Sequence, residues 1–295
     1  MDARIRVARV SLHLWEEPCI SGEGGSGTVF FSGCSLGCVY CQNREISRAA
    51  VGRTVSIQQL TFIFLLLQEK GAENINLVTP SHYAPAIKEA VELARQQGLE
   101  LPIIYNCSGY ERVEALRQLE GIVDVYLTDF KYMDQELARR YSRAKDYPQV
   151  ARAALAEMVR QQGQAVFDGR GIMKKGVILR HLLLPGAVGN GKKIVRYAYE
   201  NYGNRIYYSL LNQYTPVEKQ EALPELNRRV TRREYDALVD MALELGVEHG
   251  FIQEGKTAQE SFIPDFDDRG LLDLIPVGEE AIDDGESLRR VGDNR

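Results

Sequence analysis

Three cysteines stand close together in the stretch FFSGCSLGCVYCQN, residues 30–43. Cys34, Cys38 and Cys41 are separated by four and then three positions, and the aromatic Tyr40 directly precedes the last of them. Iron–sulfur clusters are held by cysteine thiolates. Three thiolates can hold three irons of a [4Fe–4S] cube, which leaves the fourth iron free for a ligand that also reacts. The spacing therefore predicts a cluster with one open position.

Zinc is the alternative metal for clustered cysteines. A structural zinc ion takes four protein ligands in a tetrahedron, and the sequence has no second Cys-x-x-Cys pair to complete such a set. A fourth ligand would have to come from a distant position, and the candidates are Cys19, His82, Cys107 and His181. We favour the cluster, and keep a zinc-binding or cluster-binding protein without catalysis as an alternative.

The elements that must position these cysteines alternate along the chain. Six short β-rich runs occur at residues 28–32, 74–79, 102–107, 123–130, 177–184 and 206–212. Helical patterns separate them, and two of these open with capping-box pairs, Ser56 with Gln59 and Thr231 with Glu234. Such alternation predicts an α/β fold in which helices cover a parallel sheet, as a barrel, a partial barrel or an open sheet.

Polar residues lie near the carboxyl ends of most of these predicted strands, within the strand or just after it. Because active sites of α/β folds form at the carboxyl ends of the strands, we expect these residues to meet at one rim together with the cysteines. They are Thr79, Ser81, His82, Asn106, Ser108, Asp129, Lys131, Arg180, His181 and Gln213.

Composition limits the setting. The 295 residues are 44% hydrophobic and 26% charged, as in ordinary globular proteins. Five cysteines, an odd number, do not form a disulfide framework, so we predict a reducing, cytoplasmic location. The longest apolar run, residues 62–67, is far below the roughly 20 residues that span a bilayer, and the first ten residues lack the apolar stretch of a secretory signal. We expect no membrane association.

Charge is unevenly distributed. The net charge is −5, yet residues 264–295 alone hold ten acidic and four basic side chains. The rest of the chain is close to neutral, which gives no electrostatic basis for binding nucleic acid. We predict an N-terminal extension over residues 1–24, one α/β domain over 25–256 and a loosely ordered acidic tail over 257–295.

The cysteine pattern, Cys-x-x-x-Cys-x-x-Cys with an aromatic residue before the last cysteine, resembles the signature of the radical S-adenosylmethionine (SAM) superfamily. Over about residues 10–255 the chain is also similar to the pyruvate formate-lyase activating enzymes and their uncharacterised relatives. The stretches that carry this likeness are HLWEEPCISG (13–22), NLVTPSHY (76–83), YLTDFKY (126–132) and ILRHLLLPG (178–186). The resemblance implies a partial (β/α)6 TIM-like barrel over residues 25–256.

The resemblance also implies a chemistry. The three cysteines would hold a [4Fe–4S] cluster whose free iron chelates the amino and carboxylate groups of SAM. One electron would then cleave SAM to methionine and a 5′-deoxyadenosyl radical, which abstracts a hydrogen atom from a substrate. A flavodoxin or ferredoxin would donate the electron, and activity would be anaerobic.

Several residues match the SAM contacts of the family. Tyr40 matches the aromatic residue near the adenine, and Gln213 lies near the adenine-side position. Asn106 stands where activating enzymes hold the ribose with an acid, with Ser108 nearby. The cationic positions that face the SAM carboxylate and the acid beside them match Lys131, Arg180 and Asp129.

One segment departs from the family pattern. Where activating enzymes bind the SAM amino group with Gly-Gly-Glu, residues 78–82 read Val-Thr-Pro-Ser-His and contain no acid. Thr79, Ser81 or backbone carbonyls are the expected replacements. The substrate also stays open: a glycyl-radical enzyme to be activated, or a small molecule or peptide.

A phosphate site is a further alternative. Residues 186–193, GAVGNGKK, nearly match a P-loop, but Lys193 stands where the loop needs Ser or Thr for Mg²⁺. We favour a loop that leads into the next helix.

Overall fold

The computed structural model describes residues 4–48, 51–253 and 270–275. Its strands are β1 (Ile5–His13), β2 (Ser26–Phe31), β3 (Arg53–Val55), β4 (Ile75–Val78), β5 (Ile103–Cys107), β6 (Val125–Asp129), β7 (Val166–Phe167), β8 (Met173–Leu182), β9 (Tyr207–Leu211) and β10 (Gly250–Ile252). Its α-helices are α1 (Pro18–Ser21), α2 (Arg44–Arg48), α3 (Ile57–Glu69), α4 (Ala84–Gln96), α5 (Val113–Gln118), α6 (Gln135–Ser142), α7 (Tyr147–Gln162), α8 (Val188–Tyr202) and α9 (Arg232–Leu245).

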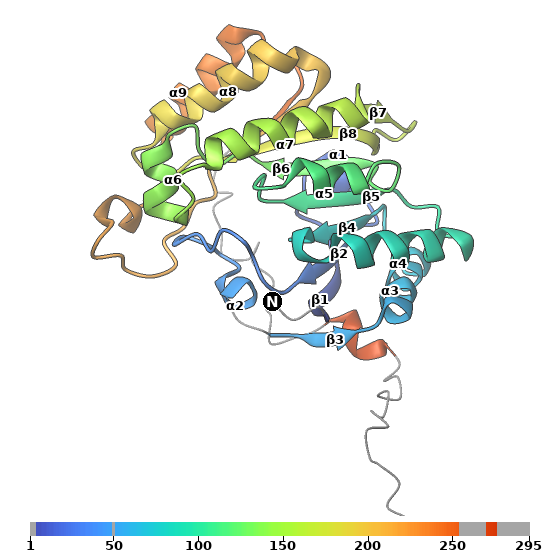
Figure 1. The fold of residues 1–295 in the computed structure, drawn as a ribbon. Helices are drawn as coiled ribbons and strands as arrows, with labels where there is room; N and C mark the ends of the chain where they lie inside the picture. The colour runs from blue at the N-terminus through green and yellow to red at the C-terminus, as the bar shows by residue number, and fades with distance from the viewer. Residues whose placement is uncertain (1–3, 49–50, 254–269, 276–295) are drawn as a thin grey trace, which may run out of the picture.

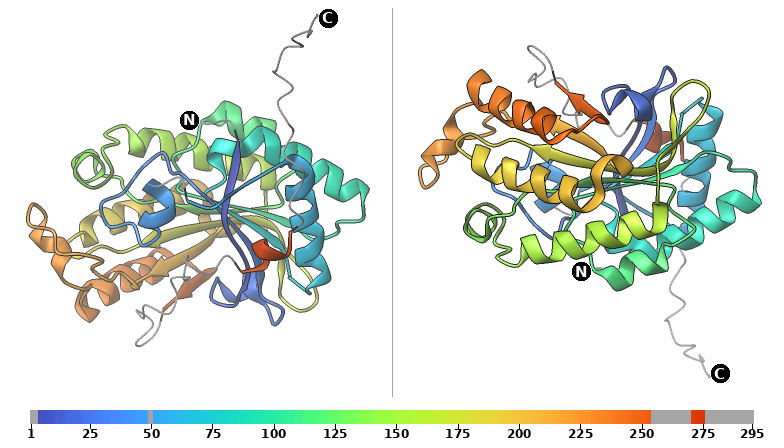
Figure 2. Two further views of the ribbon diagram at one scale, coloured as in Figure 1. Left: turned by 90° about the horizontal axis from the view of Figure 1, so that it is seen from below. Right: turned by 90° about the horizontal axis from the view of Figure 1, so that it is seen from above.

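One curved sheet organises the molecule, in the order β10-β9-β8-β6-β5-β4-β2-β1-β3. The strands from β2 to β10 in this order pair in parallel, whereas β1 is antiparallel to both β2 and β3. The longer helices cover the outer face of the sheet (Figures 1 and 2). The predicted α/β fold with a parallel sheet is confirmed, and all six predicted strands are present. An open order with two edge strands agrees with a partial TIM-like barrel.

Local sequence signals explain where two of the covering helices begin. Gln59 N donates to Ser56 Oγ at 3.2 Å, and Ser56 N donates to Gln59 Oε1 at 2.9 Å, which caps α3. The equivalent pair of Thr231 and Glu234 caps α9. Each bond satisfies an N–H that the first helical turn leaves without a partner, so both predicted helices begin where their capping residues stand.

The two chain ends contribute to the sheet more than their sequences suggest. Residues 5–13, which we predicted to lie in an extension, form β1, and its buried Val7 and Val10 explain why it joins the core. Of the predicted tail, residues 270–275 are described: Gly270 pairs with Val10, and Leu272 is fully buried. The rest of the tail lies outside the described residues, and the domain boundaries stay predictions.

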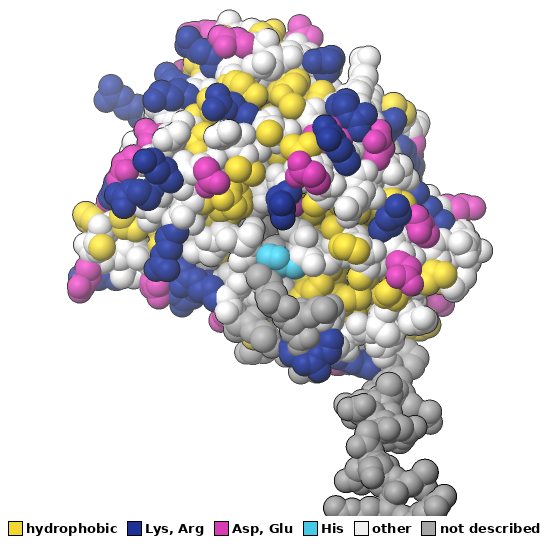
Figure 3. All heavy atoms as spheres, in the orientation of Figure 1, with side chains coloured by type: hydrophobic (Ala, Val, Ile, Leu, Met, Phe, Trp, Pro, Cys, Tyr) yellow, Lys and Arg dark blue, Asp and Glu magenta, His cyan; other side chains and the backbone are white. Residues whose placement is uncertain are grey.

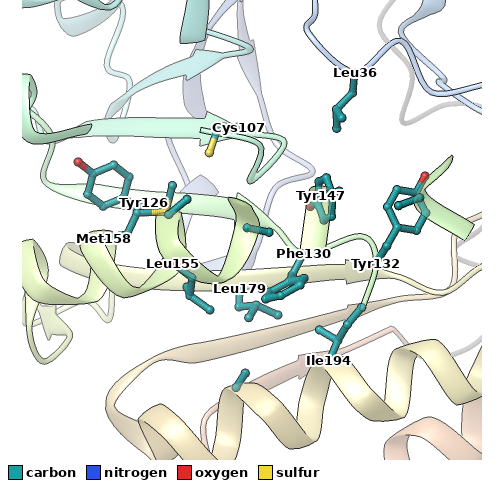
Figure 4. Packing of buried hydrophobic residues seen from close by; sticks show 14 of the residues in the cluster. Leu36, Cys107, Tyr126, Phe130, Tyr132, Tyr147, Leu155, Met158, Leu179 and Ile194 are labelled. Atoms are coloured by element: carbon teal, nitrogen blue, oxygen red, sulfur yellow. The ribbon is translucent and has the colours of Figure 1, made fainter. Parts of the chain in front are cut away.

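An aromatic core lies between the sheet and α7 and α8. Figure 4 shows part of it, with Tyr126, Phe130, Tyr132 and Tyr147 labelled. The same core cluster contains Leu36, Cys38 and Tyr40, all less than a tenth exposed. The cysteine segment is therefore packed into the core on one side while it faces the strand ends on the other.

The surface carries both signs of charge. On the face drawn in Figure 3, Lys and Arg side chains alternate with Asp and Glu. Within the described part of the chain, no helix combines the length and apolar character that crossing a membrane requires.

Candidate functional site

A cavity of about 250 Å³ opens at the carboxyl ends of the parallel strands. Its walls come from the segment after β2 and from the ends of β4, β5, β6, β8 and β9. Twelve residues were predicted to bind the cluster or SAM, and the structure brings eleven of them together here. They are Cys34, Cys38, Tyr40, Cys41, Thr79, Asn106, Ser108, Asp129, Lys131, Arg180 and Gln213. Ser81 is not among the lining residues.

The cysteine segment contains one backbone position, between Cys34 and Cys38, that needs glycine. Gly37 has a φ of +55°, a conformation that costs a side-chain-bearing residue energy. Two backbone bonds then hold the segment: Val39 N donates to Tyr141 O at 2.9 Å, and Cys41 N donates to Cys38 O at 3.2 Å. The first bond fastens the segment to the end of α6, far away in sequence.

Two of the thiols accept hydrogen bonds from serine hydroxyls. Ser142 Oγ lies 3.0 Å from Cys38 Sγ, and Ser47 Oγ lies 3.6 Å from Cys41 Sγ. Burial raises the pKa of both thiols, while these hydroxyls and the nearby charge of Lys131 act in the opposite direction. The surroundings thus supply donors and a cation that favour thiolates once a metal centre is bound.

The donor set fits a three-cysteine cluster better than a closed zinc site. Cys107 also lines the cavity, but burial raises its thiol pKa and its Sγ is 3.4 Å from Thr128 Oγ1. His82 and His181 do not line the cavity. Among the described residues, no three Cys, His, Asp or Glu side chains are gathered as an ion site, and this holds for the three motif cysteines as well. The three thiols line the same cavity, and of the four candidate zinc ligands only Cys107 lines it with them.

Side chains of opposite charge form ion pairs at the strand ends. Asp129 Oδ2 accepts from Lys131 Nζ at 2.5 Å, and Asp129 Oδ1 accepts from Arg180 Nε at 3.2 Å. Arg180 Nη2 also donates to Asn106 Oδ1 at 2.5 Å. Burial by itself would raise the pKa of Asp129, but the two cations outweigh it and lower that pKa. Asp129 is thus a carboxylate that fixes both cations.

Sequence reasoning missed Glu16, which lines the same cavity from the loop between β1 and α1. Its Oε2 accepts from Arg180 Nη1 at 3.1 Å, and its Oε1 accepts from Asn76 Nδ2 at 3.2 Å. Burial raises the pKa of Glu16, although Arg180 opposes the shift. The three guanidinium nitrogens of Arg180 all bond to the chain, so only the remaining N–H groups are free for a ligand. The only signal was the resemblance of residues 13–22, which contain Glu16.

The segment after β4, where the family's acid is missing, is unusual in its backbone. Thr79 has a φ of +59°, which is rare for a residue with a branched side chain, and its N–H donates to Asn106 O at 2.9 Å. Ser81 Oγ instead donates to the buried Glu111 at 2.6 Å. Of the two predicted replacements for the acid, Thr79 lines the cavity, and Ser81 is engaged elsewhere.

Three predicted contacts have partners outside the charged group. Tyr40 Oη is 2.7 Å from Tyr132 Oη. The carbonyl of Ser108 accepts from Tyr147 Oη at 2.7 Å. Gln213 Oε1 accepts from a neighbouring glutamine, Gln253, at 2.8 Å.

The near P-loop is part of a helix. The helix α8 begins at Val188, so Lys192 and Lys193 lie within it and the predicted loop ends earlier than expected. A Cβ on Gly191 would lie 2.9 Å from His181 Nε2, so close packing explains this glycine. The segment is the first turns of a packed helix, which removes the geometric basis for a phosphate loop.

Comparisons with known proteins agree with this fold. Residues 28–174 match the sequence model of the Radical SAM superfamily, and this part of the chain is a radical SAM superfamily domain. Members of this superfamily use a [4Fe–4S] cluster and SAM.

A curated relative is the uncharacterized protein MJ0674 of Methanocaldococcus jannaschii, which is 29% identical over 242 residues. The match covers 78% of this chain and 65% of that protein, so the chain spans less than two thirds of its relative.

Solved structures share the fold at low identity. SuiB of Streptococcus suis bound to S-adenosylmethionine superposes with a TM-score of 0.51 and 13% identity, covering 77% of this chain and 49% of SuiB. Methylornithine synthase (PylB) gives 0.51 and 14%, over 80% and 63% of the two chains. HydG, a maturase of the [FeFe]-hydrogenase, gives 0.50 and 14%, over 78% and 52%.

Proposed function

We propose that this protein is a radical SAM enzyme that abstracts a hydrogen atom from its substrate. One observation carries the proposal: three cysteines at the family spacing share a cavity with the charged and amide side chains of four strand ends. When bound, the cluster and SAM supply an electron transfer that yields methionine and a 5′-deoxyadenosyl radical.

The residues of this chain bind the cluster and SAM and orient them. Cys34, Cys38 and Cys41 hold the cluster. Lys131 and the free N–H groups of Arg180 face the carboxylate of SAM, and Asp129 keeps both cations in place through its two oxygens. Because these groups are fixed before SAM binds, little ordering cost is left for the binding step.

The remaining predicted contacts select the other parts of SAM. Bonds to Glu16 and Arg180 fix the amide of Asn106, and its remaining N–H and oxygen lone pair would bind the ribose diol. Thr79 offers a hydroxyl and a backbone carbonyl to the SAM amino group in place of an acid. Tyr40 and Gln213 would contact the adenine.

We further propose that the substrate is the Cα–H of a glycine in a partner enzyme, with a flavodoxin or ferredoxin as electron donor and the cytoplasm as location. The resemblance to activating enzymes supports this assignment, and the open order of the sheet is compatible with access by a protein segment. A small molecule or peptide is the alternative substrate.

The test is anaerobic reconstitution with iron and sulfide, followed by SAM and dithionite, with 5′-deoxyadenosine measured by mass spectrometry. We expect product from the wild type and from Cys107→Ala, and none from Cys38→Ala. Cys107→Ala is a matched control because Cys107 lines the same cavity without belonging to the motif. Zinc in place of iron, or product from Cys38→Ala, would overturn the proposal.

A further inference from the structure

A chain of three buried hydroxyl groups ends on the sulfur of Cys38. Tyr40 Oη lies 2.7 Å from Tyr132 Oη, Tyr132 Oη lies 2.7 Å from Ser142 Oγ, and Ser142 Oγ lies 3.0 Å from Cys38 Sγ. All four side chains are less than a tenth exposed, and Figure 4 shows Tyr132 within the aromatic core. The segments involved are up to 104 residues apart in sequence.

The direction of this chain is fixed. A thiolate that binds a metal has no proton to donate, so Ser142 must donate its single proton to Cys38. Ser142 can then only accept from Tyr132, and Tyr132 can only accept from Tyr40. A tyrosine hydroxyl has a single proton, so each tyrosine donates one bond and accepts the other. Every bond points toward the sulfur.

The position of Ser142 is itself well determined. It is the last residue of α6, whose first turn is capped by Asp134, and it is only 3% exposed. The neighbouring Tyr141 O accepts the N–H of Val39, the residue after Cys38. Two adjacent contacts therefore press the end of α6 against the cysteine segment.

We propose that Tyr40, Tyr132 and Ser142 form a one-directional hydrogen-bond relay that raises the reduction potential of the cluster through Cys38. Hydrogen bonds to the ligating sulfurs are a main determinant of cluster potentials, because they stabilise the reduced, more negative state. Bonds in such a chain polarise one another, so the two tyrosines strengthen the bond that Ser142 makes. This inference rests on the proposed function, since it requires a cluster on Cys38.

A second serine near a motif cysteine, Ser47, provides an internal control for Ser142. Ser47 Oγ approaches Cys41 Sγ at 3.6 Å, and it also lies 3.3 Å from Arg44 O, so its proton has a competing acceptor. No further hydroxyl feeds this serine in the described residues. The relay predicts a large effect on potential at Ser142 and a small one at Ser47.

The experiment is an EPR-monitored redox titration of the reconstituted cluster without SAM. We expect Ser142→Ala to give the most negative potential, followed by Tyr132→Phe, Tyr40→Phe and Ser47→Ala, and we expect Ser142→Thr to recover the wild-type value. If Ser142→Ala takes up no cluster, Tyr40→Phe decides, because Tyr40 bonds to Tyr132 and reaches the sulfur only through Tyr132 and Ser142. Unchanged potentials in the Ala and Phe variants, or a shift in Ser47→Ala as large as in Ser142→Ala, would overturn the relay. Absence of a cluster in the wild type would instead refute the proposed function.

Discussion

The strand-end charges and the cysteine thiols face the same cavity, but the protein holds them in different ways. Asp129 and Arg180 are register partners on the adjacent strands β6 and β8. Their side chains are bonded to each other, and Asp129 is also bonded to Lys131. The thiols lie on a segment between β2 and α2, and the described residues contain no assembled set of three ligands. The sheet register places the charged side chains before any ligand binds. The three thiols, in contrast, reach their final arrangement only when the metal centre binds.

Removing one thiol should therefore abolish cluster binding without unfolding the protein. In Cys34→Ala we expect complete loss of bound iron and of absorbance near 400 nm, because three ligands are the minimum for the cluster. Cys34 is half-buried, so the free energy of unfolding of the apoprotein should change by only about 0.5 kcal/mol. Iron analysis and denaturant unfolding measure the two effects. A folded apoprotein that is strongly destabilised would contradict the comparison.

At the strand ends, in contrast, we expect an effect of pH on the free energy of unfolding. His181 on β8 is fully enclosed, and burial lowers its pKa from 6.5 to about 4. Between these values the unfolded chain binds more protons than the folded one, so stability falls as the pH drops from 6.5 to 4. The loss can reach about 3 kcal/mol, at 1.36 kcal/mol for each pKa unit.

Replacing this histidine isolates its contribution. Urea unfolding of His181→Asn should show a flatter pH dependence over this interval, because Asn does not titrate but can still donate to Phe130 O, as the ring does at 2.8 Å. Parallel stability curves for the wild type and the variant between pH 6.5 and 4 would show that His181 does not contribute.

Removing the central carboxylate should weaken the fold by a smaller amount. Asp129→Asn leaves Lys131 without its ion-pair partner, and we expect a loss of about 2 kcal/mol at pH 7, moderated because the carboxyl group is a quarter exposed. Since the folded pKa of Asp129 lies below 3.8, this contribution is present above that pH and vanishes as the pH falls further. Chemical unfolding at pH 7 and pH 3 tests both statements. Glu16→Gln, which leaves Arg180 paired with Asp129, should cost less.

The smallest expected effect concerns backbone strain at the cavity. Thr79→Gly should increase the free energy of unfolding by about 0.5–1 kcal/mol, because glycine adopts a φ of +59° without steric cost. Arg143→Gly is the matched control, since Arg143 has a φ of +56° and lies outside this cavity. Both variants should be more stable, but only Thr79→Gly should bind SAM more weakly in equilibrium dialysis. Equal SAM affinities would remove Thr79 from the binding site.

Much of the frame was predictable from local patterns. Alternating β-rich runs and capped helical stretches give the order of the elements, and parallel strands bring their carboxyl ends to one edge. For this reason Asp129, Lys131 and Arg180 could be expected at one rim from positions that are up to 51 residues apart. The cysteine spacing predicted the kind of centre, because ligand spacing in a short segment follows from the metal chemistry.

Long-range contacts were not predictable in the same way. Glu16 meets Arg180 across 164 residues, and Ser142 meets Cys38 across 104. A single glutamate after a strand or a serine at a helix end has many common structural roles, so its type carries no information about a distant partner. The pairing of β1 with β2 and of Gly270 with Val10 likewise depends on which edge of the sheet remains free.

The sequence by itself determined the cysteine motif, the parallel α/β frame and the set of polar residues at the strand ends, because each depends on spacing within a segment or on strand direction. Only the tertiary structure decided that Arg180 is already bonded by Glu16, Asp129 and Asn106, that Ser81 is bound to Glu111, and that a hydroxyl chain reaches Cys38. These outcomes depend on which side chains share a buried volume, and there each donor must find an acceptor wherever the fold places one.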